Sequence, residues 1–220
     1  GGLGTRRELR IADIGCGTGA STLRLAAALD ARIAAVDLLP DFLERLRARA
    51  ARAGFSERIE TVASAMDALP FSDGEFDAIW SEGAIYNIGF NAGAEAWRRF
   101  LKPGGVLAVS ELTWLTAERP RALQAHWDAE YPEVDTASAK IAALERLGYA
   151  PSGYFALPER CWIDNFYAPM RRRFPAFLDR WGGSDAARAL VEAEESEIGL
   201  YERYKAFVSY GFYLARRTPD

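Results

Sequence analysis

Short apolar runs alternate with amphipathic stretches along the first half of the chain. The helical patterns cover residues 21–29 and 40–53, and a further helix carrying Trp97 and Leu101 is expected to begin at Asn91. Runs of five or six mostly apolar residues separate these patterns and predict buried strands at residues 9–14, 31–36, 59–63, 76–80 and 106–110. Strands that alternate with helices in this way indicate βαβ units and a parallel sheet.

The second half of the chain is less regular. A strand is predicted at residues 154–157 and an alternating aromatic strand at residues 208–215. Helices are predicted over residues 120–131, 137–147, 166–181 and 184–204. In the last helix, Ser184 is the expected cap, and the expected buried side consists of Leu190, Val191, Ile198 and Tyr201.

Composition narrows the class of protein. The 220 residues carry a net charge of −4, which argues against non-specific nucleic-acid binding, and no charge-free stretch is long enough to predict a membrane span. Two cysteines favour a reducing cytoplasm, and with a single histidine they exclude most zinc and metal-hydrolase spacings, so no metal site is expected. Of the 27 aromatic residues, 18 lie after residue 110, so the two halves are built differently.

The strongest local signal lies between the first predicted strand and the helix that follows it. Residues 13–19 read Asp-Ile-Gly-Cys-Gly-Thr-Gly. Glycines at such a turn let the backbone bend sharply and let a ligand approach without a Cβ in the way. The N-terminus of the next helix offers free N–H groups to a polar ligand group. This loop is therefore the primary candidate for a binding site.

Three carboxylates follow the ends of successive strands and define what that loop can bind. Asp13 lies two residues before the first glycine, where it can receive an ammonium group. Asp37 ends the second strand, 18 residues after Gly19, and can accept both hydroxyls of a ribose. Asp67 follows the third strand, where it can accept an adenine amino proton while Met66 packs on the ring. A structural role stays open for each carboxylate. Asp13 can bond to the backbone amides of the loop, Asp37 can stand just before the next helix, and Asp67 can cap a turn.

The same loop also fits the dinucleotide fingerprint, as Gly15-x-Gly17-x-x-Ala20. A pyrophosphate would meet Asp13 poorly, whereas the amine of a methionine-like ligand would meet it well. No Tyr/Lys or His/Asp set for hydride transfer is evident. An NAD(P)-dependent oxidoreductase is thus the less favoured alternative, beside a non-catalytic cofactor-binding or partner-binding module.

Together these motifs resemble those of the class I S-adenosylmethionine-dependent methyltransferases. That family carries Asp-x-Gly-x-Gly-x-Gly, an acidic end of the second strand, and an acidic residue ahead of a Leu-Pro-Phe step, as at residues 67–71. Residues 76–81 resemble its fourth strand and residues 101–105 the turn before its fifth. The resemblance covers about residues 9–112 and the closing strand. It implies an α/β fold, with a Rossmann-like seven-stranded and mostly parallel sheet, helices on both faces, and a helical insertion before the last strand.

The resemblance also implies a cofactor and a domain plan. The cofactor is S-adenosylmethionine, with S-adenosylhomocysteine as the product. The chain is expected to form a single methyltransferase domain over residues 1–220, with helical substrate-cap elements at about 113–135 and 163–205. Members usually carry a segment before the first strand that helps to enclose the substrate, and here eight residues precede Leu9. The implied cofactor-binding residues are Asp13, Gly15, Cys16, Gly17, Gly19, Asp37, Leu38, Met66, Asp67 and Glu82.

Residues 80–90 look like a bacterial subgroup of small-molecule or uncharacterised methyltransferases. Related enzymes place a His, Tyr or Glu that faces the substrate at the position of Tyr86. Glu82 is the first choice for a polar group near the sulfonium or the incoming nucleophile. Both are catalytic candidates, although many methyl transfers need no strong base. Candidates for the substrate wall, each of which can instead be a core aromatic, are Tyr86, Trp114, Trp127, Tyr131, Trp162 and Tyr167.

The expected activity is methyl transfer from S-adenosylmethionine to a small-molecule acceptor by in-line displacement. The sulfonium is a good leaving group, so the protein mainly aligns the reactants and excludes water. The acidic surface and the aromatic second half suit an enclosed pocket rather than a protein, nucleic-acid or membrane partner. Oxygen, nitrogen, carbon and arsenic acceptors all remain open, because the fold does not fix the acceptor.

Overall fold

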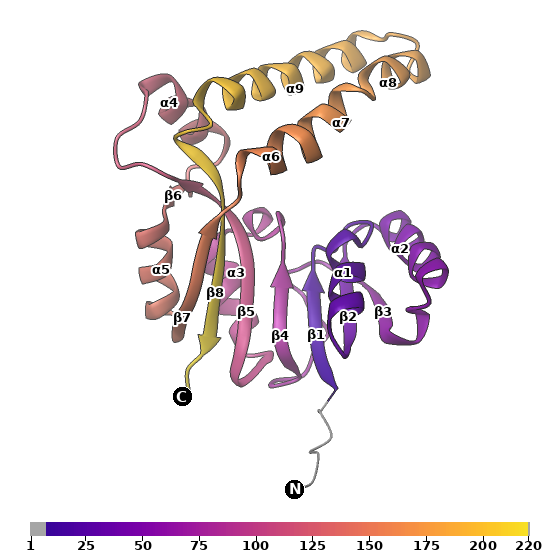
Figure 1. Cartoon of the computed structure of the whole chain (residues 1–220), viewed down its shortest axis with the longest axis vertical. Coiled ribbons are helices and arrows are strands. Elements are labelled where there is room, and N and C mark those ends of the chain that lie inside the picture. Colours follow the sequence, from indigo (N-terminus) through magenta and orange to yellow (C-terminus); the bar gives the residue numbers. More distant parts are fainter. Residues whose placement is uncertain (1–7, 220) are drawn as a thin grey trace, which may run out of the picture. The chain divides into compact units, whose positions relative to one another are not determined.

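The computed structural model describes residues 8–219, so the stretch ahead of the first strand lies almost wholly outside the described residues. The strands form one sheet in the order β3-β2-β1-β4-β5-β8-β7, and a short strand, β6, pairs with β5 off this path (Figure 1). The strands are β1 (Leu9–Ile14), β2 (Ala31–Asp37), β3 (Ile59–Ala63), β4 (Phe76–Ser81), β5 (Leu101–Trp114), β6 (Asp135–Thr136), β7 (Tyr149–Ala156) and β8 (Val208–Arg217).

Parallel pairing dominates this sheet. β1 pairs in parallel with β2 and β4, β2 with β3, and β5 with β4 and β6. β8 runs antiparallel to β7, because Leu157 N donates to Tyr210 O at 2.8 Å while Thr218 N donates to Gly148 O at 3.0 Å. In Figure 1 the arrow of β8 points against those of its neighbours. The predicted α/β sheet of seven mostly parallel strands is confirmed, with β6 as a short addition.

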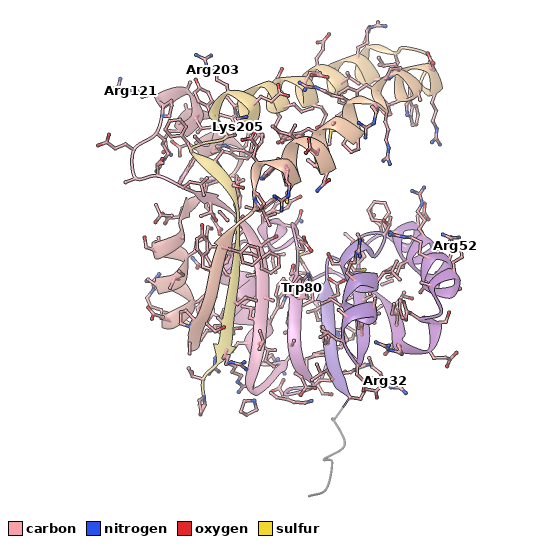
Figure 2. All side chains as sticks on the ribbon, in the orientation of Figure 1. Arg32, Arg52, Trp80, Arg121, Arg203 and Lys205 are labelled. Atoms are coloured by element: carbon pink, nitrogen blue, oxygen red, sulfur yellow. The ribbon has the colours of Figure 1, made fainter. Side chains whose placement is uncertain are left out.

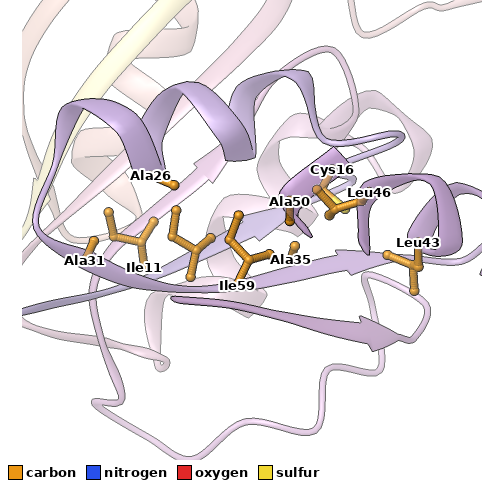
Figure 3. Close-up of a cluster of buried hydrophobic side chains, with 10 residues drawn as sticks. Ile11, Cys16, Ala26, Ala31, Ala35, Leu43, Leu46, Ala50 and Ile59 are labelled. Atoms are coloured by element: carbon orange, nitrogen blue, oxygen red, sulfur yellow. The ribbon is translucent and has the colours of Figure 1, made fainter. Parts of the chain in front are cut away.

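The β1–β2 part of the sheet is buried on both faces. Helices α1 (Ala20–Ala28) and α2 (Pro40–Ala53) cover one face, where Ile11, Ile33 and Leu46 belong to one apolar cluster (Figure 3). The alternate positions Ala12 and Ala34 point to the opposite face and are equally buried. Burial on both sides explains why these strands are mostly apolar in sequence rather than alternating regularly between apolar and polar residues.

The boundary between α3 (Phe90–Arg98) and β5 differs from the prediction in two ways. The helix begins after Gly89, whose φ of 88° only glycine adopts readily, so Asn91 is not its cap. Leu101 belongs to β5 and not to the helix. Leu101 pairs with Phe76, but Val106 pairs with Ala78, so residues 102–105 bulge out of the ladder. The Pro-Gly-Gly turn therefore interrupts the pairing of β5 with β4, but β5 already begins before the turn, at Leu101.

The described residues divide into two compact units. The first contains the residues through Glu111, then residues 138–155 and those from Phe212 onward. It includes α1, α2, α3 and most of α5 (Ala137–Arg146). The second contains residues 112–137 and 156–211. Both predicted helical cap segments, 113–135 and 163–205, fall in the second unit.

The second unit is helical and more broken than predicted. The helix expected over residues 166–181 is instead several short helices, and α7 and α8 each carry a proline in the first turn. Proline lacks a backbone N–H, so neither proline can continue the regular hydrogen-bond pattern of an α-helix. The helices are α4 (Arg121–Glu130), α6 (Glu159–Trp162), a π-helical turn (Ile163–Tyr167), α7 (Ala168–Arg171), α8 (Phe174–Arg180) and α9 (Asp185–Tyr204).

Helix α9 packs through fewer residues than its sequence suggests. The predicted cap is confirmed, because Ser184 Oγ accepts a hydrogen bond from Ala187 N at 3.3 Å. Ile198 and Tyr201 are buried as expected, whereas Leu190 is 51% exposed, so its predicted burial is wrong. None of the helices in the described range combines the length and the apolar character needed to cross a membrane.

Candidate functional site

The first unit contains a cavity of about 620 Å³ at the carboxyl ends of β1 to β4. Ligands of open α/β sheets bind at this edge, and the volume is in the range of small-molecule and cofactor sites. Four segments form its walls, one after each strand. The lining residues are Gly15, Gly17, Val36, Asp37, Leu38, Leu39, Phe42, Ser64, Ala65, Met66, Asp67, Gly83, Ala84, Tyr86, Asn87 and Ile88.

The glycine loop is fixed to the end of β2. Gly15 N and Cys16 N both donate to Val36 O at 2.9 Å. Gly15, Gly17 and Gly19 have φ values of 75°, 56° and 81°, a region that other residues rarely adopt. A Cβ on Gly15 would lie 2.3 Å from Ala84 Cβ, whereas no atom lies within 4 Å of the corresponding point at Gly17. The loop therefore packs closely on one side and leaves open space beside Gly17, where it lines the cavity.

Asp37 connects the glycine loop to the start of α2. Its Oδ2 accepts a hydrogen bond from Gly17 N at 2.8 Å, and its Oδ1 accepts one from Leu39 N at 2.9 Å. A carboxylate has about four acceptor positions, so two bonds leave capacity for further donors. Asp37 also lines the cavity, which makes it available to a ligand with paired hydroxyls.

Asp13 lies beneath the loop and is almost completely buried. Its Oδ2 accepts a hydrogen bond from Thr22 Oγ1 at 2.5 Å. Burial raises the pKa of the Asp13 carboxyl to about 7; the Thr22 hydrogen bond opposes this rise, and the carboxylates of Glu82 and Asp37 add to it. A cation placed nearby would restore the charged form. Asp13 does not line the cavity, so it acts on that space through its charge and its support of the loop.

Two of the predicted cofactor residues lie in the loop after β3. Met66 and Asp67 both line the cavity, and Asp67 is exposed. Met66 Cε lies 3.6 Å from the point where a Cβ on Gly15 would stand, so the Met66 side chain reaches across to the glycine loop. The apolar side chain of Met66 and the exposed residue Asp67 therefore belong to the same wall of the cavity.

The two catalytic candidates follow β4 and differ in their position. Glu82 is exposed but lies outside the cavity lining; its Oε2 accepts hydrogen bonds from Ser21 Oγ at 2.5 Å and from Trp80 Nε1 at 3.4 Å. Trp80 itself projects from β4 (Figure 2). Tyr86 does line the cavity and is 44% exposed. The loop after β4 therefore carries one polar ring in the cavity and one carboxylate beside it.

Three further predicted residues stand in different surroundings. Leu38 lines the cavity and is 67% exposed. Cys16 is buried, and its burial raises the pKa of the thiol, which disfavours a nucleophilic thiolate. Gly19 packs against α2, because a Cβ there would lie 2.1 Å from Leu46 Cδ1. Cys16 and Gly19 shape the loop from behind.

The predicted substrate-wall aromatics of the second unit belong mostly to its core. Trp114, Trp162 and Tyr167 are buried in one apolar cluster, and Trp127 packs against it. The Trp162 ring stacks on those of Tyr201 and Tyr210, at centroid distances of 4.8 and 5.0 Å. That indole is therefore packed among aromatic rings of the second unit. Tyr131, at the end of α4, is partly buried.

Several lining residues had no signal of their own in the sequence. Leu39 and Phe42 come from the start of α2, Ser64 and Ala65 from the loop after β3, and Asn87 from the turn after β4. Their side chains are chemically ordinary. The only signal for them in the sequence was position, because each lies close to a predicted site residue just beyond the carboxyl end of a strand.

Fold, glycine loop and carboxylates together define a nucleoside-binding α/β protein of the S-adenosylmethionine-dependent methyltransferase class. Residues 11–105 match the family model described as a methyltransferase domain. The chain is 32% identical to the 27-O-demethylrifamycin SV methyltransferase of Amycolatopsis mediterranei, over 100% of this chain and 81% of that protein. The chain thus belongs to the methyltransferase-domain family.

Solved structures agree on the fold. A methyltransferase from Geobacter sulfurreducens in complex with S-adenosylhomocysteine superposes with a TM-score of 0.82 at 20% identity, covering 97% of this chain and 86% of that one. Phosphoethanolamine N-methyltransferase 2 of Haemonchus contortus, in complex with S-adenosylmethionine, superposes with a TM-score of 0.69 at 16% identity, covering 99% and 50%. The protein is an enzyme that transfers the methyl group of S-adenosylmethionine.

The described cavity fits this cofactor. Asp37 retains acceptor capacity for ribose hydroxyls, the space beside Gly17 is open, and Asp67 presents a carboxylate at the far wall. Asp13 beneath the loop favours a cationic group nearby. When bound, the cofactor supplies an electrophilic methyl carbon on a sulfonium, and the chain supplies the surfaces that hold it.

Proposed function

We propose that the acceptor is a hydroxyl group of a small organic molecule. The observation that carries this proposal is the 32% identity along the whole chain to an enzyme whose name specifies methylation of a hydroxyl oxygen of rifamycin SV. The neighbour from Haemonchus contortus also has a small-molecule acceptor in its name, phosphoethanolamine. Both favour a small molecule over a macromolecule.

The residues on the cavity wall take distinct roles in this proposal. Asp37 binds the ribose hydroxyls, Asp67 accepts the adenine amino proton, and Met66 packs on the adenine ring. Asp13 stabilises the ammonium end by its charge. Gly15 and Gly17 allow the close approach, and Leu38 covers the adenine side; Cys16 and Gly19 hold the loop in shape. The support is that six of the ten predicted cofactor-binding residues line one cavity, and that Asp13, Cys16, Gly19 and Glu82 belong to the segments that form its walls.

Methyl transfer by in-line displacement places two demands on the chain. The acceptor oxygen must lie opposite the sulfur, about 3 Å from the methyl carbon, and water must be excluded. Tyr86, in the cavity wall after β4, is the proposed contact to the acceptor hydroxyl. Glu82, fixed by Ser21 and Trp80, is the proposed carboxylate beside the sulfonium and can take up the proton that leaves the methylated oxygen.

The aromatic residues of the second unit are the proposed source of acceptor specificity. Trp127, Tyr131, Trp114, Trp162 and Tyr167 are the candidates, and the first two are the more accessible. A unit with many aromatic side chains suits an apolar acceptor with a reactive hydroxyl. Buried Trp114, Trp162 and Tyr167 would then act by supporting the wall rather than by forming its surface.

The test is product formation. The purified protein is incubated with S-adenosylmethionine and a panel of hydroxylated and aminated small molecules, and S-adenosylhomocysteine and methylated products are measured by mass spectrometry. O-methylated product with wild type, lost in Tyr86→Phe while S-adenosylhomocysteine binding is kept, is the expected result. Methylation confined to amines would overturn the hydroxyl assignment. Binding of NAD but not of S-adenosylhomocysteine would overturn the cofactor roles given to these residues.

A further inference from the structure

Helix α3 is joined to two separate walls of the cofactor cavity. Its first residue, Phe90, follows closely on residues 83–88, which form the wall after β4. Near its other end, Trp97 Nε1 donates a hydrogen bond of 2.8 Å to the main-chain oxygen of Met66, which lies in the wall after β3. Helix α3 therefore follows one wall directly along the backbone and is hydrogen-bonded to the other through the side chain of Trp97.

The Met66 wall has few other ties to regular structure. Ser64 N donates to Asp37 O at 3.2 Å, whereas the bond from Ala68 N to Ala65 O lies within the loop itself. Ser64 Oγ likewise bonds to Ala65 O and Ala68 O. The indole of Trp97 is completely buried, so its N–H has a large desolvation penalty unless Met66 O accepts it. The bond is thus a strong constraint on where Met66 lies.

The start of α3 is held equally closely. A Cβ on Gly93 would lie 2.7 Å from Ile85 Cγ1, so the helix packs directly on the turn after β4. Gly93 N donates to Gly89 O at 2.9 Å, which continues the helix to its first turn. Asn87 Nδ2 donates to Ala84 O at 2.9 Å and closes that turn. Because a helix is rigid over nine residues, the two walls are held at a set separation.

We propose that Trp97 is a positioning residue for the cofactor, acting through its N–H on Met66 so that α3 sets the distance between the adenine-side wall and the acceptor-side wall. This inference rests on the proposed role of Met66 and Asp67 in binding adenine. Trp97 does not line the cavity, so its effect passes through the Met66 main chain. Loss of the N–H releases the loop while the helix and the core remain in place.

The test compares two variants, each of which removes one hydrogen bond that involves α3. Trp97→Phe removes the N–H that reaches the cavity wall. Tyr149→Phe is the matched control, because buried Tyr149 Oη donates to Ala94 O of α3 at 2.7 Å but does not line the cavity. For Trp97→Phe, the Kd for S-adenosylhomocysteine and for adenosine should rise by about 3- to 10-fold. For Tyr149→Phe both should stay within about twofold of wild type, with a similar loss of Tm.

A second measurement keeps the test decisive if Trp97→Phe folds poorly. Benzothienylalanine at position 97 keeps the shape of the indole and lacks the N–H. Amide hydrogen exchange should then increase at residues 64–68 and stay unchanged at residues 85–88. Unchanged affinity and unchanged exchange in a folded variant would overturn the role of Trp97. Failure of wild type to bind S-adenosylhomocysteine would instead count against the proposed cofactor roles, so the two failures are distinguishable.

Discussion

The hydroxyl of Thr22 donates a 2.5 Å hydrogen bond to the carboxyl of Asp13, and both side chains are buried under the glycine loop. Thr22 comes from the first turn of α1 and Asp13 from the end of β1, so this bond ties the two elements on either side of the loop. The burial that makes the bond strong also raises the pKa of Asp13 to about 7. The same buried position of Asp13 therefore both supports the loop and sets the pH range in which its carboxyl is charged.

The first prediction concerns stability against pH. The pKa of Asp13 is about 7 in the folded chain and near 3.8 in the unfolded chain, so its contribution is fully present below about pH 4 and is lost as the pH rises through 7. Asp13→Asn keeps an acceptor for Thr22 and removes this loss, which is on the order of a few kcal/mol. Urea unfolding of both proteins at roughly pH 5 and pH 8 measures it. Equal pH dependence in the two proteins would contradict the burial effect.

Cofactor affinity should show the opposite trend with pH. A cationic ammonium near Asp13 favours the ionised carboxyl, so binding is strongest above about pH 7 and weakens as the pH falls below it, by up to about tenfold per unit. S-adenosylhomocysteine is the right probe because it has the ammonium without the sulfonium. Calorimetry of wild type and Asp13→Asn across this range provides the comparison. The prediction fails if the asparagine variant shows the same slope.

Of the carboxylates at the site, Asp37 should contribute most to the binding of the cofactor's ribose. Asp37→Ala removes charge-assisted bonds worth about 1.5–3 kcal/mol, which corresponds to about 10- to 150-fold in the affinity for S-adenosylhomocysteine. Asp41→Ala is the matched control, because Asp41 lies four residues further on, in the first turn of α2, is exposed and does not line the cavity. Equal affinities of the two variants would remove Asp37 from the ribose site.

Three glycine variants separate backbone strain from contact with the cavity. Gly17 and Gly74 both have positive φ and no atom near the point of a Cβ, so alanine at either should cost a similar ~1 kcal/mol of stability. Only Gly17→Ala should also weaken S-adenosylhomocysteine binding, because Gly17 lines the cavity. Gly15→Ala should be the least stable, since its Cβ would overlap Ala84 Cβ. Chemical denaturation and calorimetry give both quantities, and similar binding by Gly17→Ala and Gly74→Ala would refute the distinction.

The first half of the fold could be predicted because its signals are local. Short, mostly apolar runs marked β1 to β4, and Pro40 and Gly54 marked the ends of α2. Predictions failed where contacts between distant parts of the chain determine the extent of a strand or the burial of a side chain. The strand predicted at residues 154–157 extends over Tyr149–Ala156, although all but its first residue are exposed, because pairing with β8 holds it. Leu190 looked like a core residue from its helical spacing, yet nothing in the sequence showed that this position of α9 would be half exposed.

The site divides in the same way. Gly15, Gly17, Asp37, Met66 and Asp67 were predicted from residue type and spacing, and the structure brings them to one cavity. The roles of Thr22 and Trp97 were not predicted, because a threonine in a helix and a tryptophan on an apolar face read as ordinary residues. Their importance depends on the two long-range hydrogen bonds they donate, to Asp13 and to Met66.

The place of β8 constrains how the chain folds as it is synthesised. β8 is synthesised after every other strand of the described residues, yet it lies between β5 and β7 in the sheet. Until it arrives, β7 has no neighbour through which to join the sheet, and one edge of β5 exposes unpaired N–H and C=O groups. Nascent chains stalled before residue 208 should therefore be prone to aggregation, although all segments that line the cavity, up to residue 88, have by then been synthesised. Loss of the last strand would remove two strands from the sheet.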